Sequence, residues 1–413
     1  MGSVQPGIFR AYDVRGKYPE EINEQVARRL GAHLAAYLRA DTFIVGHDAR
    51  PGSDALATDV IEGAMGTGAH VRDIGEVSTP QFQWATRARD AVGGIMVTAS
   101  HLPESQNGFK AVARRGDVLE VIGGDQLRQI FDSQEGEMQR GTVTRESVFA
   151  DYAAAVAYAA AWKGGTELRI SIDAPAAVQR VLERLGPIAP DASLAARCDA
   201  DGDRIAFFLH GIEVPADHIF LLLTERMNLA PVVFDLRFSK LVHERLDHAN
   251  VRYAVSRVGR LYLSLAMRQR GAAFGGEISG HYYWSAMGGM ESPELTLLQV
   301  LNVCGGDAHR LDELLRPYDR YAKSPEISLP IRDRKQASAV MAQLERRYAG
   351  CRMDKQDGLT VDCWDGHLST RPEDGFWFNI RPSNTEPLLR LIVESKEKDL
   401  LQQRVAEVCG IIG

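Results

Sequence analysis

Two short stretches of the sequence carry side chains that could do chemistry together. In residues 98–103 (Thr-Ala-Ser-His-Leu-Pro) the hydroxyl of Ser100 stands beside the imidazole of His101, and Lys110 follows closely. Residues 199–204 offer three carboxylates at alternate positions, those of Asp199, Asp201 and Asp203, which in an extended segment would all point to one side. A hard divalent cation prefers oxygen ligands of this kind. A serine, a carboxylate-bound metal and nearby cations are the parts needed to carry and transfer a phosphoryl group.

Two further stretches suit the recognition of a phosphorylated sugar. In residues 276–281, Glu277 and Ser279 stand between glycines, so a hydrogen-bond acceptor and a donor could meet neighbouring sugar hydroxyls at close backbone approach. Residues 381–387 combine a guanidinium, hydroxyl groups and backbone N–H groups in one turn, which is suitable chemistry for a phosphate group. The side chains concerned are Arg381, Ser383, Asn384 and Thr385.

The elements that must position these residues follow from hydrophobic periodicity. Apolar residues at helical spacing predict a helix over residues 21–40, and a second helix with Ser53 as its N-cap. Strands are expected at residues 42–45 and 94–97, and the latter delivers Ser100 to a loop at its C-terminal end. In open α/β sheets, ligands bind at that edge. Further strands are predicted at residues 168–172, 231–235 and 272–274.

The last quarter of the chain has a different texture. It predicts mostly strands and one closing helix, which together indicate a small α+β domain. The strands are expected at residues 326–331, 359–362, 376–380 and 388–393, and the helix at 398–408. We therefore predict an α/β protein with three βα-type mixed-sheet domains and a C-terminal α+β domain. The expected bounds are residues 1–140, 141–228, 229–322 and 323–413.

Composition narrows the class of protein. The 413 residues are 45% hydrophobic and carry a net charge of −7, which gives no general attraction to nucleic acid or to an anionic membrane. The sequence has no basic-then-apolar signal segment and no 18-residue uncharged apolar run, so we expect a cytoplasmic globular protein. Five cysteines without a CxxC pair favour a reducing compartment and argue against a disulfide framework or a zinc site.

The four motifs, with residues 9–16 (Phe-Arg-Ala-Tyr-Asp-Val-Arg-Gly) as an opening motif, resemble the α-D-phosphohexomutase superfamily. The likeness is greatest to the bacterial phosphomannomutase/phosphoglucomutases. It implies four domains around one central cleft and a sugar phosphate as substrate. It also implies Mg²⁺ as cofactor, a hexose 1,6-bisphosphate as activator, and exchange of phosphate between C1 and C6 of a hexose. Mannose and glucose phosphates are the leading substrates, and we expect a monomer or homodimer.

The resemblance assigns roles residue by residue. Ser100 would be carried as a phosphoserine, and its phosphate would complete a metal site with Asp199, Asp201 and Asp203. Glu277 and Ser279 would bind sugar hydroxyls, and the turn at residues 381–385 would hold the phosphate that is not reacting. The remaining catalytic residues implied are His101, Lys110, Arg15, Arg204 and His281, with either Lys110 or His101 as general acid and base. Residues 47–50 are expected to support the serine loop.

Some positions depart from the family pattern. Leu102 replaces the usual asparagine beside the serine, and Ala200 replaces a glycine in the metal loop. The second domain is shorter than usual, residues 257–260 (Arg-Val-Gly-Arg) stand where a lysine and a histidine are common, and residues 290–294 replace an Asp-Asp-Gly run. Two alternatives follow: a mutase for another sugar phosphate such as glucosamine phosphate, or a relative that binds a sugar phosphate without turnover.

Overall fold

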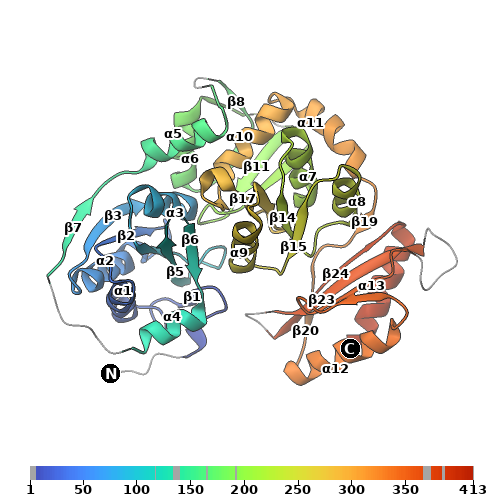
Figure 1. Cartoon of the computed structure of the whole chain (residues 1–413), viewed down its shortest axis with the longest axis horizontal. Coiled ribbons are helices and arrows are strands. Elements are labelled where there is room, and N and C mark those ends of the chain that lie inside the picture. Colours follow the sequence, from blue (N-terminus) through green and yellow to red (C-terminus); the bar gives the residue numbers. More distant parts are fainter. Residues whose placement is uncertain are drawn as a thin grey trace. The chain divides into compact units, whose positions relative to one another are not determined.

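The structure of the chain is a computed structural model that describes residues 6–116, 118–133, 140–163, 166–190, 193–365, 374–383 and 387–412. The chain divides into two compact units. The first contains residues 1–233 and 259–314, and the second contains residues 234–258 and 315–413. Both units are mixed α/β structures (Figure 1), as the sequence predicts.

A mixed sheet positions the serine loop in the first unit. Its strand order is β1 (Val14–Lys17), β5 (Gln106–Arg115), β4 (Gly93–Val97), β2 (Thr42–His47), β3 (His70–Glu76) and β7 (Thr142–Arg145), with β6 (Val118–Ile122) beside β5. The neighbours among β4, β2, β3 and β7 pair parallel, whereas β5 pairs antiparallel with β1, β4 and β6. The carboxyl ends of the parallel strands share one edge, and Ser100 follows β4 at that edge. The predicted strands at 42–45 and 94–97 are confirmed.

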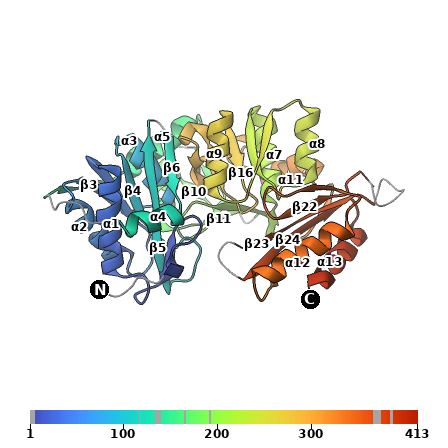
Figure 2. The ribbon, with the colours of Figure 1, turned by 60° about the horizontal axis from the view of Figure 1, so that its bottom comes forward.

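Helices cover both faces of this sheet (Figure 2). On one face lie α1 (Glu24–Leu38), α2 (Ser53–Met65) and α4 (Gly124–Phe131), and on the other lies α3 (Thr79–Ala88). Successive residues of β2 divide between the two cores, since Phe43 and Val45 join the first and Ile44 joins the second. The predicted N-cap at Ser53 is wrong. Gly52 precedes the helix with φ 81°, and Ser53 is its first residue.

The segment that follows forms two small sheets. In one, β8 (Leu168–Arg169) pairs parallel with β10 (Ile188–Ala189). The other has the order β13 (Ile212–Val214), β12 (Ile205–Leu209), β11 (Leu194–Cys198) and β9 (Ser171–Asp173). The strand predicted at 168–172 is therefore broken at Ile170, whose N–H donates to Leu168 and Ala189. The accompanying helices are α5 (Phe149–Ala159), α6 (Ala176–Leu185) and α7 (Ala216–Met227).

A short antiparallel ribbon completes the first unit. Strand β16 (Phe274–Gly276) pairs with β17 (Tyr282–Trp284), which pairs with β18 (Met290–Glu291). Residues 277–281 form the loop between β16 and β17, so the ribbon presents the glutamate-serine motif at its tip. The strand itself begins at Phe274, two residues later than the 272 expected from the sequence. The neighbouring helices are α9 (Arg260–Arg270), α10 (Pro293–Cys304) and α11 (Ala308–Leu315).

The second unit is built on an antiparallel sheet. Its strands are β19 (Ala322–Lys323), β24 (Leu388–Ser395), β23 (Phe376–Pro382), β22 (Leu359–Asp362) and β21 (Arg352–Asp354), with β20 (Ile327–Pro330) also paired to β24. Helices α12 (Arg334–Arg347) and α13 (Lys398–Ile412) pack on it through one apolar core. This confirms the predicted α+β texture. The unit also contains α8 (Lys240–His248) and β15 (Tyr253–Ser256). The boundary between the two units falls within β14 (Val232–Asp235).

Single turns of 3₁₀-helix occur at η1 (Pro6–Ile8), η2 (Ser285–Met287) and η3 (Arg316–Tyr318).

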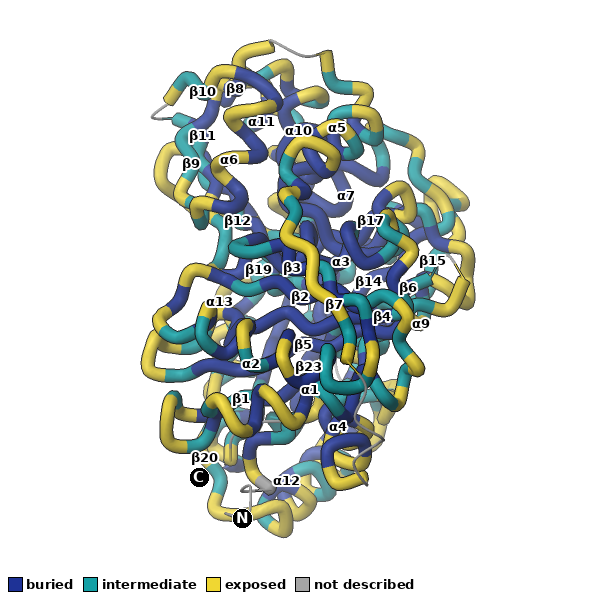
Figure 3. The backbone as a smooth tube through the Cα atoms, turned by 90° about the vertical axis from the view of Figure 1, so that its left-hand side faces the viewer, coloured by how far each residue is buried: buried dark blue, intermediate teal, exposed yellow. Residues whose placement is uncertain are grey.

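Strand β7 is exposed at all of its residues (Figure 3). It lies beyond the expected boundary at residue 140, yet it pairs with β3 of the first sheet. The four-domain division stays a prediction. Among the described helices, none has both the length and the apolar character needed to cross a membrane.

The cysteines correct one expectation. Cys351 and Cys363 form a disulfide, with Cα atoms 5.0 Å apart. Strands β21 and β22 pair antiparallel with Arg352 opposite Asp362, so the residues just outside that pair face each other. The absence of a CxxC motif says nothing about cross-strand neighbours, because only their spatial separation decides whether two cysteines can be joined. Cys198, Cys304 and Cys409 are free thiols.

Candidate active site

Ser100 lies in a constrained turn at the carboxyl edge of the first sheet. It is 2% exposed and adopts φ 55°, a left-handed conformation that costs a residue with a side chain about 1 kcal/mol or more. Its N–H donates to Thr98 Oγ1 at 2.9 Å, and its Oγ lies 3.4 Å from His101 Nδ1. Strained conformations of this kind cluster at functional sites.

Arg50 supports the loop that carries Ser100, as residues 47–50 were expected to do. Its guanidinium donates to four backbone carbonyls of the loop, those of Ser100, Leu102, Pro103 and Gln106. Asp48 fixes the guanidinium through a 3.0 Å bond to Arg50 Nε. The loop therefore depends on Arg50 for its shape, and Leu102 enters this network only through its backbone.

The three aspartates converge, but not for the reason given by their alternate spacing. Residues 199–204 form a turn rather than an extended strand. Asp199 Oδ1 accepts from the N–H groups of Asp203 and Arg204, both at 3.1 Å, and Gly202 takes φ 65°. One carboxylate oxygen from each aspartate lies within 4.8 Å of the other two. Ala200 leaves this geometry intact.

Lys110 connects β5, the strand that follows the serine loop, to this carboxylate cluster. It extends from β5, and its Nζ lies 2.5 Å from both Asp201 Oδ2 and Asp203 Oδ2. Burial alone would lower the pKa of Lys110, but the two carboxylates outweigh burial and raise it. The ammonium is therefore charged. In return it keeps the pKa of Asp201 and Asp203 low despite their burial.

The cluster retains unmet capacity for a cation. Burial, and then the charges of Asp203 and Asp201, raise the pKa of Asp199 well above its usual range. Within the described residues, Asp199 Oδ2 and Asp201 Oδ1 are buried without a hydrogen-bond partner, and Asp203 Oδ1 lies 3.2 Å from His281 Nε2. Buried carboxylate oxygens normally have partners. These residues thus fit a hard divalent cation with oxygen ligands.

His101 and His281 have opposite charge states. Partial desolvation, and then the charges of Arg204 and Arg15, lower the pKa of His101 to about 4, so this imidazole is neutral at pH 7. His281 is buried, which lowers its pKa, but Asp203 and then Glu277 raise it to about 9. The structure thus places a neutral imidazole beside Ser100 and a cationic one beside the aspartates.

The glutamate-serine loop connects to the same cluster through His281. Its Nδ1 lies 2.8 Å from Ser279 Oγ and 3.2 Å from Glu277 Oε2. Glu277 also accepts from the N–H of Gly259 and from the hydroxyl of Tyr283, each at 2.8 Å. Glu277 is thus held rigidly, and its contact with a sugar hydroxyl stays a prediction.

Two arginines flank the aspartates from other elements. Arg204 Nε lies 3.4 Å from His281 Nε2 and 3.6 Å from Asp199 Oδ2. Arg15, on β1, donates to Asp13 Oδ2 at 2.8 Å from Nε. Burial would lower the pKa of Arg15, but Asp13 and then Asp201 and Asp203 raise it. All predicted site residues of the first unit therefore belong to one region.

Several residues of this region were not predicted. Arg260 Nη2 is 2.6 Å from Glu291 Oε1, and its Nη1 is 3.9 Å from Asp203 Oδ2. Thr79 Oγ1 donates to Asp201 Oδ2 at 2.7 Å. The departure from the family pattern at residues 257–260 was the one signal that pointed to Arg260. Thr79 lies 122 residues before its partner, and no local pattern announces such a contact.

The predicted phosphate turn belongs to the second unit. Arg381 lies on β23, is 7% exposed, and donates from Nη2 to Glu326 Oε2 at 3.2 Å. The N–H of Ser383 donates to the carbonyl of Leu388 at 2.8 Å. Asn384 and Thr385 lie outside the described residues.

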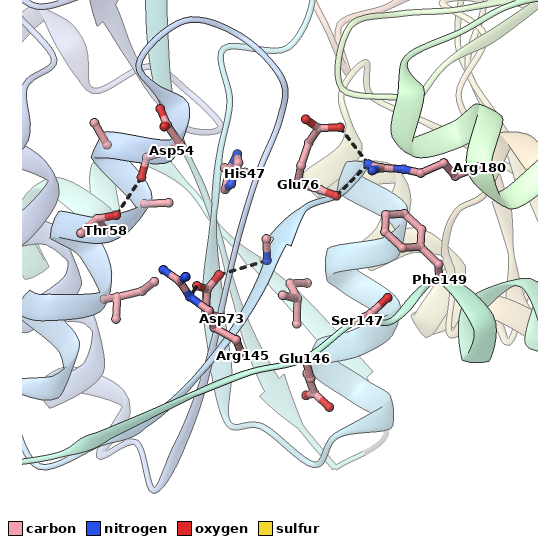
Figure 4. Close-up of a pocket in the computed structure, with 15 residues that line it drawn as sticks. His47, Asp54, Thr58, Asp73, Glu76, Arg145, Glu146, Ser147, Phe149 and Arg180 are labelled. Carbon is pink, nitrogen blue, oxygen red and sulfur yellow. Dashed lines mark hydrogen bonds and ion pairs between the residues drawn. The ribbon is translucent and has the colours of Figure 1, made fainter.

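A separate cavity of about 630 Å³ opens beside α2, β2 and β3 (Figure 4). Among the predicted catalytic, metal and substrate residues that the structure describes, none lines it, although His47 from the stretch expected to support the serine loop does. Two ion pairs lie in its lining, since Arg180 points to Glu76 at 2.8 Å and Arg145 reaches Asp73 at 2.9 Å. The cavity is therefore not part of the cluster around Ser100.

Comparisons with known proteins agree with this chemistry. Three models of the phosphoglucomutase/phosphomannomutase family match the chain: alpha/beta/alpha domain I at residues 6–165, alpha/beta/alpha domain III at 215–321, and the C-terminal domain at 327–411. The chain belongs to the α-D-phosphohexomutase superfamily. This phosphohexomutase is an isomerase, a mutase that acts as an intramolecular phosphotransferase.

Individual relatives extend the likeness over the whole chain. A phosphomannomutase of Methanocaldococcus jannaschii is 27% identical over 98% of this phosphohexomutase and 97% of its own length. A phosphoglucomutase/phosphomannomutase family protein of Burkholderia thailandensis shares the fold, with a TM-score of 0.83 at 21% identity, over 99% and 98% of the two chains. An N-acetylphosphoglucosamine mutase of Aspergillus fumigatus, solved with GlcNAc-6P and magnesium, has a TM-score of 0.54 at 13% identity, over 100% and 96% of the two chains.

Proposed function

We propose that this phosphohexomutase interconverts a hexose 1-phosphate and a hexose 6-phosphate through a phosphoserine at Ser100. The observation that carries the proposal is the bridge from Lys110 to Asp201 and Asp203, each at 2.5 Å. Lys110 is on β5, the strand that follows the serine loop. The bridge therefore connects the loop of Ser100, whose backbone is strained, to the carboxylate cluster that would bind the cation. Phosphoryl transfer depends chiefly on such positioning and charge neutralisation.

The reaction would proceed in two transfers. In the first, the bond between phosphorus and Ser100 Oγ breaks, and a bond from phosphorus to a hydroxyl oxygen of the sugar phosphate forms. The hydroxyl proton passes to a base and Ser100 Oγ gains a proton as it leaves, so the products are free Ser100 and a hexose 1,6-bisphosphate. This intermediate turns end over end. In the second transfer, Ser100 Oγ loses its proton and bonds to the other phosphorus, the bond from that phosphorus to the sugar oxygen breaks, and the released sugar oxygen gains a proton.

The charge states favour His101 over Lys110 as the base. His101 is neutral, with a pKa of about 4, and lies 3.4 Å from Ser100 Oγ. The pKa of Lys110 is raised, and its ammonium already donates to two carboxylates. We assign Lys110 to charge neutralisation together with Arg15 and Arg204, because cations near a transferring phosphoryl group stabilise its charge.

We further propose that Asp199, Asp201 and Asp203 hold Mg²⁺, with a phosphate on Ser100 as another ligand. The buried oxygens Asp199 Oδ2 and Asp201 Oδ1, which have no hydrogen-bond partner among the described residues, support this assignment, as does the presence of magnesium with the Aspergillus fumigatus relative. When bound, the ion supplies Lewis-acid polarisation of the phosphoryl oxygens.

The remaining residues would recognise the sugar phosphate. Glu277 and Ser279 would bind hydroxyls of the ring, oriented by His281 at 3.2 Å and 2.8 Å. Arg381 and Ser383, with Asn384 and Thr385, would hold the phosphate that is not being transferred. A hexose 1,6-bisphosphate would act as activator because it can load Ser100.

A coupled assay tests the function and its substrate together. Mannose 1-phosphate, glucose 1-phosphate and glucosamine 1-phosphate are each supplied with Mg²⁺ and a hexose 1,6-bisphosphate, and formation of the 6-phosphate is followed. We expect turnover of the mannose and glucose phosphates. Turnover of the glucosamine phosphate alone would move the proposal to an amino sugar. No turnover, combined with tight binding of any of them, would favour a binding protein.

A further inference from the structure

Charged side chains of the second unit gather around the carboxylate of Glu326. Its Oε2 accepts hydrogen bonds from Arg237 Nη1 at 2.9 Å and from Arg381 Nη2 at 3.2 Å. Its Oε1 lies 4.0 Å from Arg390 Nε. One carboxylate thus faces three guanidinium groups.

Arg237 is held in place without help from Glu326. It follows β14, and it donates from Nε and Nη2 to the two carboxylate oxygens of Asp235, at 3.0 Å and 2.6 Å. Arg237 is 5% exposed and Asp235 is fully buried. This paired geometry is the rigid arrangement that arginine makes with a carboxylate. It fixes the guanidinium and directs Nη1 toward Glu326.

Arg381 adds unmet donor capacity to the cluster. Its side chain is 9% exposed, and within the described part of the chain its Nε has no hydrogen-bond partner. Among the described residues, the guanidinium groups of Arg237, Arg381 and Arg390 face Glu326, and Arg237 also pairs with Asp235. Rigid, buried guanidinium groups with free donors are the usual means of binding a phosphate.

We propose that Glu326 occupies, in the free protein, the place that a phosphate group of the substrate takes on binding, and that Arg237 is a further phosphate ligand beside Arg381. The inference rests on the function proposed above, in which Arg381 anchors the phosphate that is not being transferred. It adds a ligand to that anchor and a carboxylate that competes for it.

The Glu326 side chain is more exposed than those of Arg237 and Arg381. The Glu326 side chain is 27% exposed, whereas those of Arg237 and Arg381 are 7% and 9% exposed. The carboxylate lies on the segment between β19 and β20, and it can turn to solvent while the arginines stay. A phosphate must displace it, so the apparent affinity falls by the fraction of molecules whose site is blocked. When the phosphate leaves, Glu326 restores the ion pairs, which favours release of a bisphosphate that has to turn.

Glu326→Gln tests the competition in the full-length protein. Glutamine keeps the size and one oxygen acceptor but removes the negative charge. We expect inorganic phosphate, titrated calorimetrically, to bind about 3- to 10-fold more tightly than to the wild type, because a charge that opposed the ligand is gone. The KM for glucose 1-phosphate should fall in the same direction. Arg237→Gln should weaken phosphate binding about tenfold.

Glu407→Gln is the matched control. Glu407, on α13, also bridges two arginines, Arg347 at 2.9 Å and Arg404 at 2.5 Å, and its side chain is 22% exposed. It loses the same charge and a comparable pair of contacts away from the cluster. We expect its phosphate affinity to equal that of the wild type.

The outcomes separate this inference from the function on which it rests. If Arg381→Ala weakens phosphate binding but Glu326→Gln binds phosphate no more tightly than the wild type, the phosphate site stands and the competition is overturned. Weaker binding by Glu326→Gln also overturns it, because Glu326 would then support the arginines. If Arg381→Ala leaves phosphate affinity unchanged, the assignment of the phosphate site itself fails.

Discussion

The ammonium group of Lys110 lies 2.5 Å from the carboxylate of Asp201, although 91 residues separate them in the chain. The same ammonium contacts Asp203 at 2.5 Å. A buried cation between two buried carboxylates ties the strand behind the serine loop to the metal loop. This contact makes the charge of the proposed site testable without any substrate.

Replacing Lys110 by methionine should reveal that charge through stability. The change leaves two buried carboxylates without their cation, so we expect a loss of about 3–5 kcal/mol in the free energy of unfolding. Millimolar Mg²⁺ should reduce the difference in unfolding free energy between the variant and the wild type, because it neutralises the same carboxylates. Thermal unfolding with and without Mg²⁺ measures both effects.

Lys240→Met provides the control for that experiment. Lys240 pairs with Asp362 at 2.7 Å in the second unit, and its side chain is 22% exposed. We expect a loss of less than about 1 kcal/mol, with no response to Mg²⁺. An equal loss for Lys110→Met in the presence and absence of Mg²⁺ would contradict the cation site.

Asp201→Asn should weaken magnesium binding while keeping the fold. It removes one charge from the cage but retains an oxygen for Thr79 and Lys110, so we expect at least a ~10-fold loss in Mg²⁺ affinity and slower turnover. Calorimetric titration and the Mg²⁺ dependence of the rate measure these. Asp173→Asn, at a side chain that is 78% exposed, should change neither. Full activity of the wild type in excess EDTA would remove the metal from the mechanism.

Glu294 predicts a pH dependence of stability. Burial raises its pKa to about 7 from the ordinary 4.5, and Tyr152 donates to its Oε2 at 2.9 Å. Between these two pKa values the folded state holds a proton that the unfolded state releases, so stability falls as pH rises through that window. At pH 8 the carboxylate costs on the order of 1–3 kcal/mol.

Glu294→Gln should remove that dependence. The amide imitates the protonated carboxyl, so the variant should unfold at a higher temperature than the wild type at pH 8. The difference should shrink toward pH 4.5. Glu313→Gln, on the exposed surface of α11, serves as control and should leave the unfolding temperature unchanged both at pH 8 and at pH 4.5. A wild-type advantage at pH 8 would show that the buried group is a stabilising anion.

Local pattern predicted the strands well where one hydrophobic run fills one strand. The strand expected at 359–362 is β22 (Leu359–Asp362), and the one at 94–97 lies within β4. It failed where tertiary pairing divides a run, as at Ile170, because each half of that run pairs with a different sheet. The disulfide was missed because strand pairing, rather than sequence spacing, brings Cys351 and Cys363 together.

The site residues show the same limit. Resemblance identified Ser100, Lys110 and the aspartates, but their convergence arises from a turn held by Asp199 rather than from the alternation of an extended strand. The resemblance also pointed to residues 47–50, but the carbonyls that Arg50 contacts, like the Asp201 partner of Thr79, lie in distant segments and leave no pattern in the neighbouring sequence. Such long-range contacts require the fold.

The most direct test of the account is the covalent state of Ser100. Wild-type protein is incubated with glucose 1,6-bisphosphate and Mg²⁺, and intact mass spectrometry followed by peptide mapping locates any added phosphoryl group. We predict one phosphoryl group on Ser100, its absence from Ser100→Ala, at least a ~10²-fold loss of rate in that variant, and unchanged behaviour of Ser105→Ala. Wild-type protein that turns over substrate yet never carries a phosphoryl group on Ser100 would contradict the mechanism.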